Sequence, residues 1–163
     1  MKIKDILLFD EQLTEEELIV QKSARDYCQK ELMPRIIDAN RNETFDKGIY
    51  KEMGQLGFLG APINGYGCAG TNYVSYGLIA REIERVDSSY RSAFSVQTSL
   101  AMHAIYHFGS DEQKDFYLPE MAKGELIGCF GLTESDAGSD PASMKTHAIE
   151  KNDGYILNGS KTW

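Results

Sequence analysis

The hydrophobic pattern of this chain changes once, near Gly124, and that change constrains the possible folds more than any other feature. Before Gly124, apolar residues recur every three or four positions, the spacing that places them on one face of an α-helix. After it, apolar and polar residues alternate, as they do in half-buried strands. Three segments carry the alternation: 126–132, 146–151 and 155–163. Helices followed by strands predict an α+β protein, with an all-α N-terminal domain and then an antiparallel β domain.

We expect the helical domain to cover residues 1–125 and the β domain to begin at residue 126. Asn152-Asp153-Gly154 suits the turn of a hairpin between the last two strands. Three strands do not form a sheet that is stable alone, and the chain ends inside the third. Residues 126–163 are therefore expected to be only the start of the β domain, in a chain of 163 residues with 42% hydrophobic residues.

Capping signals and helix breakers divide the helical part. Thr14 with Glu17, and Ser110 with Gln113, have the spacing of capping boxes and predict helix starts. Pro34 is expected to kink or end the first helix. A glycine-rich loop is expected before residue 71. The other helices are predicted over 45–56, from 71 onward, over 88–108 and from 110 to just before Gly124.

Composition excludes several classes of function. A net charge of −8 disfavours binding to nucleic acid or anionic lipid. No segment is apolar over the length of a membrane span, and the N-terminus turns acidic after a short apolar run, unlike a signal or transit peptide. Cys28, Cys68 and Cys129 form no C-x-x-C pair and are interpreted as packing residues in a reducing compartment. We expect a cytoplasmic protein, or a mitochondrial matrix protein if a presequence has been removed.

His103 and His107 have the i, i+4 spacing of two zinc ligands on one helix face. No third ligand accompanies them, and no Glu stands in an H-E-x-x-H arrangement. They are interpreted as partly buried or surface histidines, and no metal site is predicted.

The stretch from Cys129 to Ser143 has the strongest character of a binding site. Its apolar run turns abruptly into hydroxyls, carboxylates and glycine. Gly138 lets a backbone approach a ligand closely, and Thr133 and Ser139 offer hydroxyls to an anion. The residues alone leave the ligand open, and an ordinary turn between strands is the alternative.

Two separated segments, in the same order, resemble the acyl-CoA dehydrogenase family. G-L-T-E-S-D-A-G-S-D-P-A-S at Gly131–Ser143 and L-N-G-S-K-T-W at Leu157–Trp163 are similar to its flavin-binding middle region. Y-R-S-A-F-S-V-Q-T-S-L at Tyr90–Leu100, followed by E-L-I-G-C-F-G-L-T-E, closely resembles glutaryl-CoA dehydrogenase. The resemblance spans nearly the whole chain from about Asp10. It departs at Ser135-Asp136-Ala137, where Pro, Asn and Ser are usual.

The resemblance implies an FAD cofactor lying between the helical and strand domains. Thr133 would hydrogen-bond the pyrimidine side of the flavin, where negative charge develops as hydride reaches N5. Trp163 would cover the isoalloxazine, and Ser139 would also reach the CoA portion of the substrate. The implied lining residues are Phe130, Gly131, Leu132, Thr133, Glu134, Ser135, Asp136, Ala137, Gly138, Ser139 and Trp163.

The resemblance also implies a role in substrate choice for Arg91. An arginine in an apolar acyl pocket can bind the terminal carboxylate of glutaryl-CoA through paired charge-assisted hydrogen bonds. A monocarboxylic acyl chain would leave that buried cation without a partner. Ser92, and also Ser95, would complete the polar end of the pocket. The alternative is a solvated charge near the start of a half-exposed helix.

The implied reaction is the α,β-dehydrogenation and decarboxylation of glutaryl-CoA to crotonyl-CoA, a step of lysine and tryptophan degradation. Electrons would pass to an electron-transfer flavoprotein, and the enzyme would be a homotetramer. The catalytic base of the family lies in a C-terminal helical domain that this chain lacks, so no base is assigned and the chain alone is expected to be inactive. Two alternatives stay open: a dehydrogenase for another short-chain acyl-CoA, and a non-catalytic helical remnant or interaction module.

Overall fold

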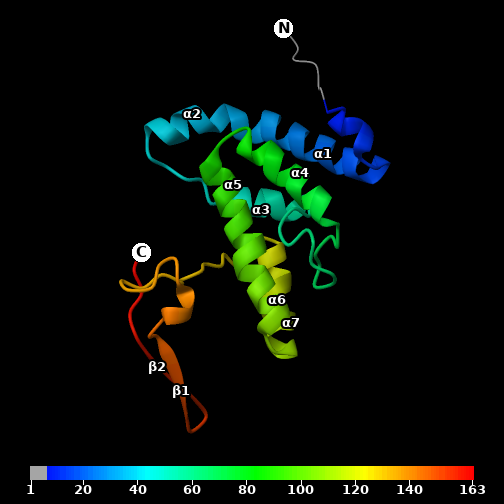
Figure 1. The fold of residues 1–163 in the computed structure, drawn as a ribbon. Helices are drawn as coiled ribbons and strands as arrows, with labels where there is room; N and C mark the ends of the chain where they lie inside the picture. The colour runs from blue at the N-terminus through cyan, green and yellow to red at the C-terminus, as the bar shows by residue number, and fades with distance from the viewer. Residues whose placement is uncertain (1–6) are drawn as a thin grey trace. The chain divides into compact units, whose positions relative to one another are not determined.

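The structure is a computed structural model that describes residues 7–163, so residues 1–6, which begin the N-terminal stretch compared above with a signal or transit peptide, lie outside it. The chain divides into two compact units. The helical unit ends at Gly128, and the strand unit is Cys129–Trp163. Helices followed by an antiparallel hairpin confirm the predicted fold class (Figure 1). The domain limits 1–125 and 126–163 stay a prediction.

The first long helix begins where the capping box predicts. The Thr14 backbone N–H donates to Glu17 Oε2 over 2.8 Å, and the Glu17 N–H donates to the Thr14 hydroxyl over 3.3 Å. This pair satisfies N–H groups that a helix start leaves without partners. Short 3-10 turn η1 (Phe9–Gln12) precedes it. The helix consists of α1 (Glu15–Tyr27), the π-helical turn η2 (Cys28–Leu32) and α2 (Met33–Arg41).

Pro34 does not end the helix, because the chain stays helical to Arg41, and the predicted alternative of a kink stays a prediction. The π-helical turn lies directly before the proline, and the Met33 N–H bonds back five residues to the Cys28 carbonyl. A π turn widens the helix, which makes room for the proline ring against the preceding turn.

The remaining helices follow the predicted segments. Asn72 and Asp87 cap two of them by accepting hydrogen bonds from backbone N–H groups, and Ser110 with Gln113 forms the predicted capping box. No helix within residues 7–163 is long and apolar enough to cross a membrane. The helices are α3 (Gly48–Gln55), α4 (Tyr73–Glu84), α5 (Ser88–Ser95), the π-helical η3 (Val96–Met102), α6 (His103–Phe108) and α7 (Asp111–Ala122); α5, η3 and α6 are continuous.

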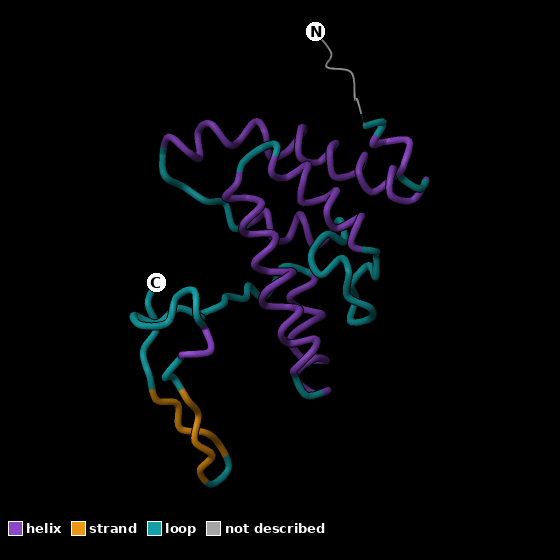
Figure 2. The backbone as a smooth tube through the Cα atoms, in the orientation of Figure 1, coloured by secondary structure: helices purple, strands orange, loops and turns teal. Residues whose placement is uncertain are grey.

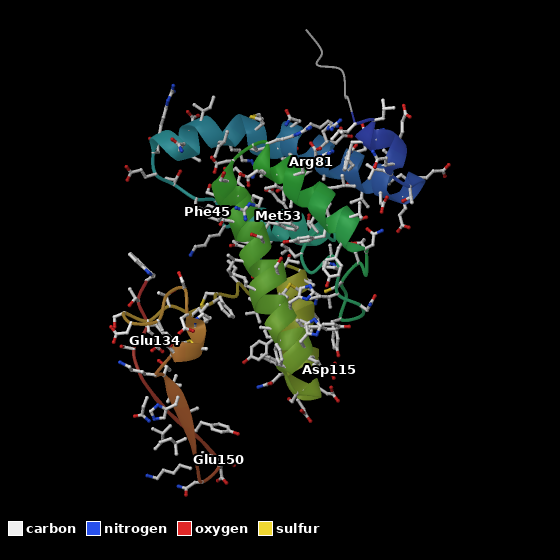
Figure 3. All side chains as sticks on the ribbon, in the orientation of Figure 1. Phe45, Met53, Arg81, Asp115, Glu134 and Glu150 are labelled. Carbon is white, nitrogen blue, oxygen red and sulfur yellow. The ribbon has the colours of Figure 1, made fainter. Side chains whose placement is uncertain are left out.

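The core lies where these helices meet, and α1 and α4 lie side by side (Figure 1). Buried Met53 of α3 packs inside it (Figure 3). In α4, Ser75 is buried and Val74 is exposed. Cys28 is a packing residue as expected, and burial raises its pKa to about 12. Cys129 is exposed, so its interpretation as a packing residue is wrong.

Backbone contacts at two glycines join α3 to the end of α7. A Cβ on Gly54 would lie 2.5 Å from the carbonyl carbon of Lys123, and one on Gly124 would lie 2.3 Å from the Tyr50 carbonyl oxygen. Gly124 also has a φ of +75°, a conformation that glycine adopts without strain. Both positions therefore require a residue without a side chain.

The strand unit contains one hairpin, with β1 (His147–Lys151) antiparallel to β2 (Gly154–Asn158) (Figure 2). Lys151 pairs with Gly154, and Asn152 takes the positive φ of the turn. The predicted hairpin is thus confirmed, although β2 ends before Trp163. The predicted strand over 126–132 is wrong. A strand needs a neighbour for its backbone hydrogen bonds, and no strand of the described chain pairs with this segment.

Candidate functional site

Arg91 lies on α5 and is held by residues on both sides of the turn between α4 and α5. Its Nε donates to Glu84 Oε2 over 2.7 Å, and its Nη1 donates to the Ser95 hydroxyl over 3.0 Å. The Ser88 hydroxyl and the Arg91 guanidinium hold the pKa of Glu84 below its usual value. The guanidinium is therefore fixed in position, with 38% of its side chain exposed.

Arg91 is already paired with a carboxylate of its own chain. The sequence predicted a buried cation that a monocarboxylic substrate would leave without a partner, whereas Glu84 at the end of α4 supplies a carboxylate to Arg91. Nη2 can still donate to a ligand carboxylate, because Glu84 and Ser95 contact the other two nitrogens. Ser95 contacts Arg91, but exposed Ser92 contributes only its carbonyl, which accepts from the Ser95 hydroxyl over 3.3 Å. Contacts between helices are invisible to periodicity, which is why Glu84 was missed.

Two consecutive polar side chains of η3 are buried. Gln97 Nε2 donates to the carbonyls of Met121 (3.1 Å) and Leu126 (2.8 Å), and Gln97 Oε1 accepts from the Gly128 N–H over 2.8 Å. Thr98 accepts from the Gly60 N–H over 3.1 Å. Hydrophobic spacing in the sequence gives no sign of these contacts, so the role of both residues was missed.

The polar loop of the strand unit is closed by reciprocal backbone hydrogen bonds. The N–H of Glu134 donates to the Ala137 carbonyl and the Ala137 N–H donates to the Glu134 carbonyl, both over 3.1 Å. Glu134 and Ala137 are buried, whereas Ser135 and Asp136 at the tip are exposed. Any ligand contact of the two buried residues would therefore use their backbone.

The buried Glu134 side chain connects three parts of the strand unit (Figure 3). Its carboxylate accepts from the backbone N–H groups of Lys145 (2.8 Å) and Thr146 (3.0 Å) and from the Lys161 ammonium (3.0 Å). Hydrogen bonds from Thr146 and Lys145, together with the Lys161 ammonium, lower the pKa of Glu134 to about 2. It is therefore a permanent anion near neutral pH and is unsuited to be a general base.

Two contacts join the end of the chain to the polar loop. Lys161 Nζ donates to the Leu132 carbonyl over 2.9 Å, and the Thr162 N–H donates to the Thr133 carbonyl over 2.8 Å. The structure thus brings together the two segments, Gly131–Ser143 and Leu157–Trp163, that carry the sequence resemblance. Beside them, the rings of Phe130 and Trp163 are exposed. Exposed aromatic rings can stack on a flat aromatic ligand, and exposed hydroxyls such as those of Ser135 and Ser139 can donate to an anionic group.

The two histidines stack on each other along one face of the helix. Their rings stack with centroids 5.6 Å apart, and Tyr73 stacks on His103 at 6.4 Å. Burial and the neighbouring His107 lower the pKa of His103. Within residues 7–163, no three metal-binding side chains gather at one place.

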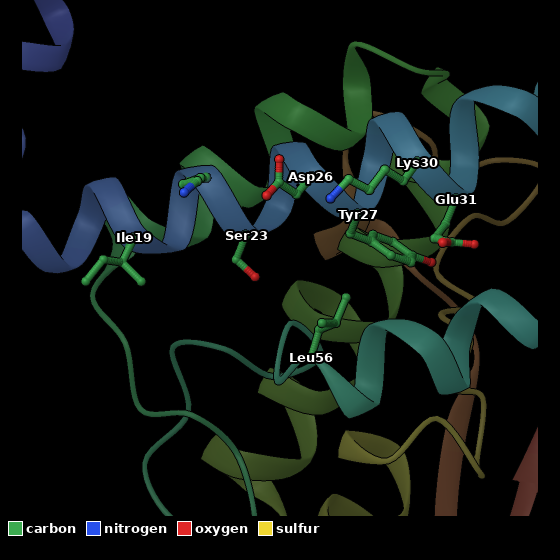
Figure 4. A pocket seen from close by; sticks show the side chains of 8 residues that line it. Ile19, Ser23, Asp26, Tyr27, Lys30, Glu31 and Leu56 are labelled. Atoms are coloured by element: carbon green, nitrogen blue, oxygen red, sulfur yellow. The ribbon is translucent and has the colours of Figure 1, made fainter.

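An open groove of about 520 Å³ runs along α1 and η2 (Figure 4). Ile19 and Leu56 form its apolar part, and Lys30 and Glu31 form its charged end. Leu56 was predicted inside the helix over 45–56, but α3 ends one residue before it and its side chain is half-exposed in this groove. None of the predicted site residues lines it.

Comparison with known proteins gives two adjoining family matches. Residues 14–125 match the family described as acyl-CoA dehydrogenase, N-terminal domain, and residues 129–163 match acyl-CoA dehydrogenase, middle domain. An acyl-CoA dehydrogenase of Bacillus subtilis is 40% identical over 150 residues, which are 91% of this chain and 40% of the relative.

Solved structures agree in fold. Glutaryl-CoA dehydrogenase from Mycobacterium smegmatis, in complex with FADH2, is 47% identical with a TM-score of 0.90, over 94% of this chain and 40% of that one. Butyryl-CoA dehydrogenase from Megasphaera elsdenii is 34% identical with a TM-score of 0.84, over 92% and 40%. The chain therefore spans about 40% of the length of the relatives that it matches.

Proposed function

The chain belongs to the acyl-CoA dehydrogenase family, and we propose from this that it is part of an FAD-dependent dehydrogenase acting on glutaryl-CoA. The family predicted from the two sequence motifs is thereby confirmed. The observation that carries the substrate proposal is the fixed guanidinium of Arg91, held by Glu84 and Ser95 with Nη2 able to bind a carboxylate.

The cofactor proposal rests on the strand unit. Lys161 and Thr162 hold the end of the chain against the polar loop, with exposed aromatic rings beside outward hydroxyls. A structural neighbour at 47% identity holds FADH2. When bound, FAD supplies the hydride acceptor. The residues proposed to contact it are Phe130, Gly131, Leu132, Thr133, Glu134, Ser135, Asp136, Ala137, Gly138, Ser139 and Trp163, of which Glu134 and Ala137 would use their backbone.

Substrate binding is assigned to both units. Arg91 binds the distal carboxylate, Ser92 adds a polar group nearby, and Ser139 contacts the CoA portion. Because Glu84 already compensates the Arg91 charge, the dicarboxylic preference comes from the added charge-assisted hydrogen bonds more than from a penalty against apolar chains.

The proposed reaction is the removal of an α-proton and a β-hydride, followed by loss of carbon dioxide to give crotonyl-CoA. The base would come from outside this chain, since the charge of Glu134 is already neutralised by its own unit. We also propose an electron-transfer flavoprotein as electron acceptor, a homotetramer as the assembly and a reducing compartment such as the cytoplasm.

Replacing Arg91 tests this proposal in the protein at its natural length. Arg91→Leu removes the partner of the distal carboxylate, which is worth about 2 to 5 kcal/mol, or roughly thirty-fold to several thousand-fold in kcat/KM for glutaryl-CoA. Activity with butyryl-CoA is expected to be unchanged or higher. Arg85→Leu is the control, because Arg85 pairs with Glu82 and does not lie on α5.

An equal fall of kcat/KM for both substrates would contradict the substrate proposal. Glutaryl-CoA would then be replaced by a short monocarboxylic acyl-CoA, the second candidate. One observation favours that candidate: the Glu84 carboxylate neutralises Arg91, so the guanidinium does not by itself exclude an uncharged acyl chain.

A further inference from the structure

Both polar atoms of the Gln97 side-chain amide are hydrogen-bonded to backbone groups: Nε2 donates two hydrogen bonds, and Oε1 accepts one. It is 1% exposed and reaches both the end of α7, at Met121, and the exit segment, which we define as residues Leu126–Gly128. The exit segment consists of the last residues of the helical unit. It forms no strand, so the amide of Gln97 replaces the ladder partner that these backbone groups lack.

Gly128 gives an independent sign that the exit segment is held closely. A Cβ on Gly128 would lie 2.4 Å from the Cβ of Ala101 and 2.7 Å from Met121 Cε. Real Cβ atoms do not approach so closely, so only glycine allows the backbone to lie against η3 at this point. A side chain at residue 128 would push the exit segment away from the helix.

We propose that Gln97 and Gly128 form a clamp on the exit segment, and that Gln97 is a positioning residue for the dehydrogenase reaction. This step rests on the proposed function. Gln97 lies on the continuous helix that carries Arg91, six residues further along. Gly128 is two residues before Phe130, a span of at most about 7 Å of chain. One side chain thus ties the carboxylate-binding helix to the backbone that leads into the flavin-lining loop.

The simpler interpretation is that the amide only fills the core. Methionine fills nearly the same volume, but it would leave the carbonyls of Met121 and Leu126 and the N–H of Gly128 without their partner. A clamp predicts that this loss moves the reacting groups, whereas a filling role predicts a loss of stability alone.

The test compares Gln97→Met with Thr98→Val in the full-length protein. Both variants remove buried hydrogen bonds of η3, but Thr98 holds the Gly60 N–H and does not contact the exit segment. Two quantities are measured: hydrogen exchange of the Gly128 amide, and the rate of flavin reduction by saturating acyl-CoA in a single turnover.

With Gln97→Met, we expect exchange at Gly128 to accelerate about tenfold or more. Flavin reduction is expected to slow by about tenfold to a hundredfold with KM little changed, because small misplacements of reacting groups act on the chemical step. Thr98→Val is expected to keep both quantities within about twofold of the parent. Gly128→Ala displaces the exit segment by adding a side chain to it, and it is expected to give the same faster exchange and slower flavin reduction as Gln97→Met. If Gln97→Met does not fold, Gly128→Ala takes its place in the test.

Unchanged exchange at Gly128 would overturn the clamp. Accelerated exchange with an unchanged reduction rate, or an equal slowing in Thr98→Val, would overturn the positioning role. Should the parent protein reduce no flavin with any acyl-CoA, the proposed function itself fails, and with it the positioning role. The exchange measurement would still decide whether the clamp exists.

Discussion

The two units of this chain are ordered by different forces. The helical unit buries a continuous apolar cluster contributed by all its long helices, including Leu32, Met53, Phe94 and Leu118. The strand unit, all of which is described, buries only Glu134 and Ala137. A helix satisfies its backbone internally and needs neighbours only for its apolar face, whereas a two-stranded hairpin leaves edges and faces open. Apolar burial therefore stabilises the first unit, whereas the hydrogen bonds and the ion pair of Glu134 order the second.

The core of the helical unit gives the largest effect. Phe94→Ala removes a fully buried ring and is expected to lower the free energy of unfolding by about 3 to 5 kcal/mol. Phe108→Ala is the matched control, because Phe108 is 89% exposed and its loss should change stability by less than about 0.5 kcal/mol. Chemical denaturation followed by circular dichroism measures both. Equal losses in the free energy of unfolding for Phe94→Ala and Phe108→Ala would contradict the conclusion that burial in the core stabilises the helical unit.

The glycine contact between α3 and α7 gives the next largest effect. Gly124→Ala forces a Cβ against the Tyr50 carbonyl and strains a positive φ, at a cost of about 2 to 4 kcal/mol. Gly77→Ala is the contrasting variant, since Gly77 lies in the interior of α4 with no atom near its missing Cβ. It is expected to stabilise the protein by about 0.5 to 1 kcal/mol. The difference in melting midpoints between the two variants is the measurement.

Acid is expected to weaken the hydrogen bonds that Glu134 accepts in the strand unit. The pKa of Glu134 is lowered from 4.5 to about 2, so its contribution is present above pH 4.5 and is lost as the pH falls toward 2. Hydrogen exchange at the amides of Lys145 and Thr146, which donate to this carboxylate, should accelerate over that range.

Glu134→Gln tests the contacts of the Glu134 carboxylate at neutral pH. Loss of the charge should accelerate exchange at both amides about tenfold, while amides of α1 and α4 stay unchanged. Glu150→Gln is the control, because Glu150 lies in β1 and is not one of the residues that contact Glu134. Acceleration throughout the helical unit would contradict the separate origin of order in the two units.

The smallest effect concerns how the helical unit begins. Thr14→Ala removes the hydroxyl that accepts from the Glu17 N–H and is expected to cost about 1 kcal/mol. Thr14→Ser keeps an acceptor and should restore most of the loss. Thermal unfolding of the three proteins, run side by side, provides the comparison. A Ser variant as unstable as the Ala variant would show that the hydroxyl does not cap α1.

Local signals predicted most of the helical unit. The capping boxes at Thr14 and Ser110 act within one turn, so a short stretch of sequence contains all the information they need. The expected end of the helix at Pro34 failed, because a π-helical turn is a change in helix geometry that hydrophobic spacing does not report. The prediction also failed over residues 126–132, because a strand depends on a neighbour.

The candidate site was predictable to a different degree in each unit. The outward residues of the polar loop came from a sequence resemblance, and the pairing of that loop with Lys161 and Thr162 brings both motifs together. Their contacts with a cofactor stay predictions. Glu84 and Gln97 were not identified, because their partners lie on other elements and no sequence spacing marks them.

The hairpin has a consequence for the behaviour of this chain in solution. Its strands have unequal edges: β1 carries Glu150 and Lys151, whereas β2 carries Tyr155, Ile156 and Leu157 in succession without a charge. All three β2 side chains are exposed, and neutral apolar edges of this kind recruit further strands. In concentrated samples of this chain, we therefore expect the outer edge of β2 to be the place where aggregation starts.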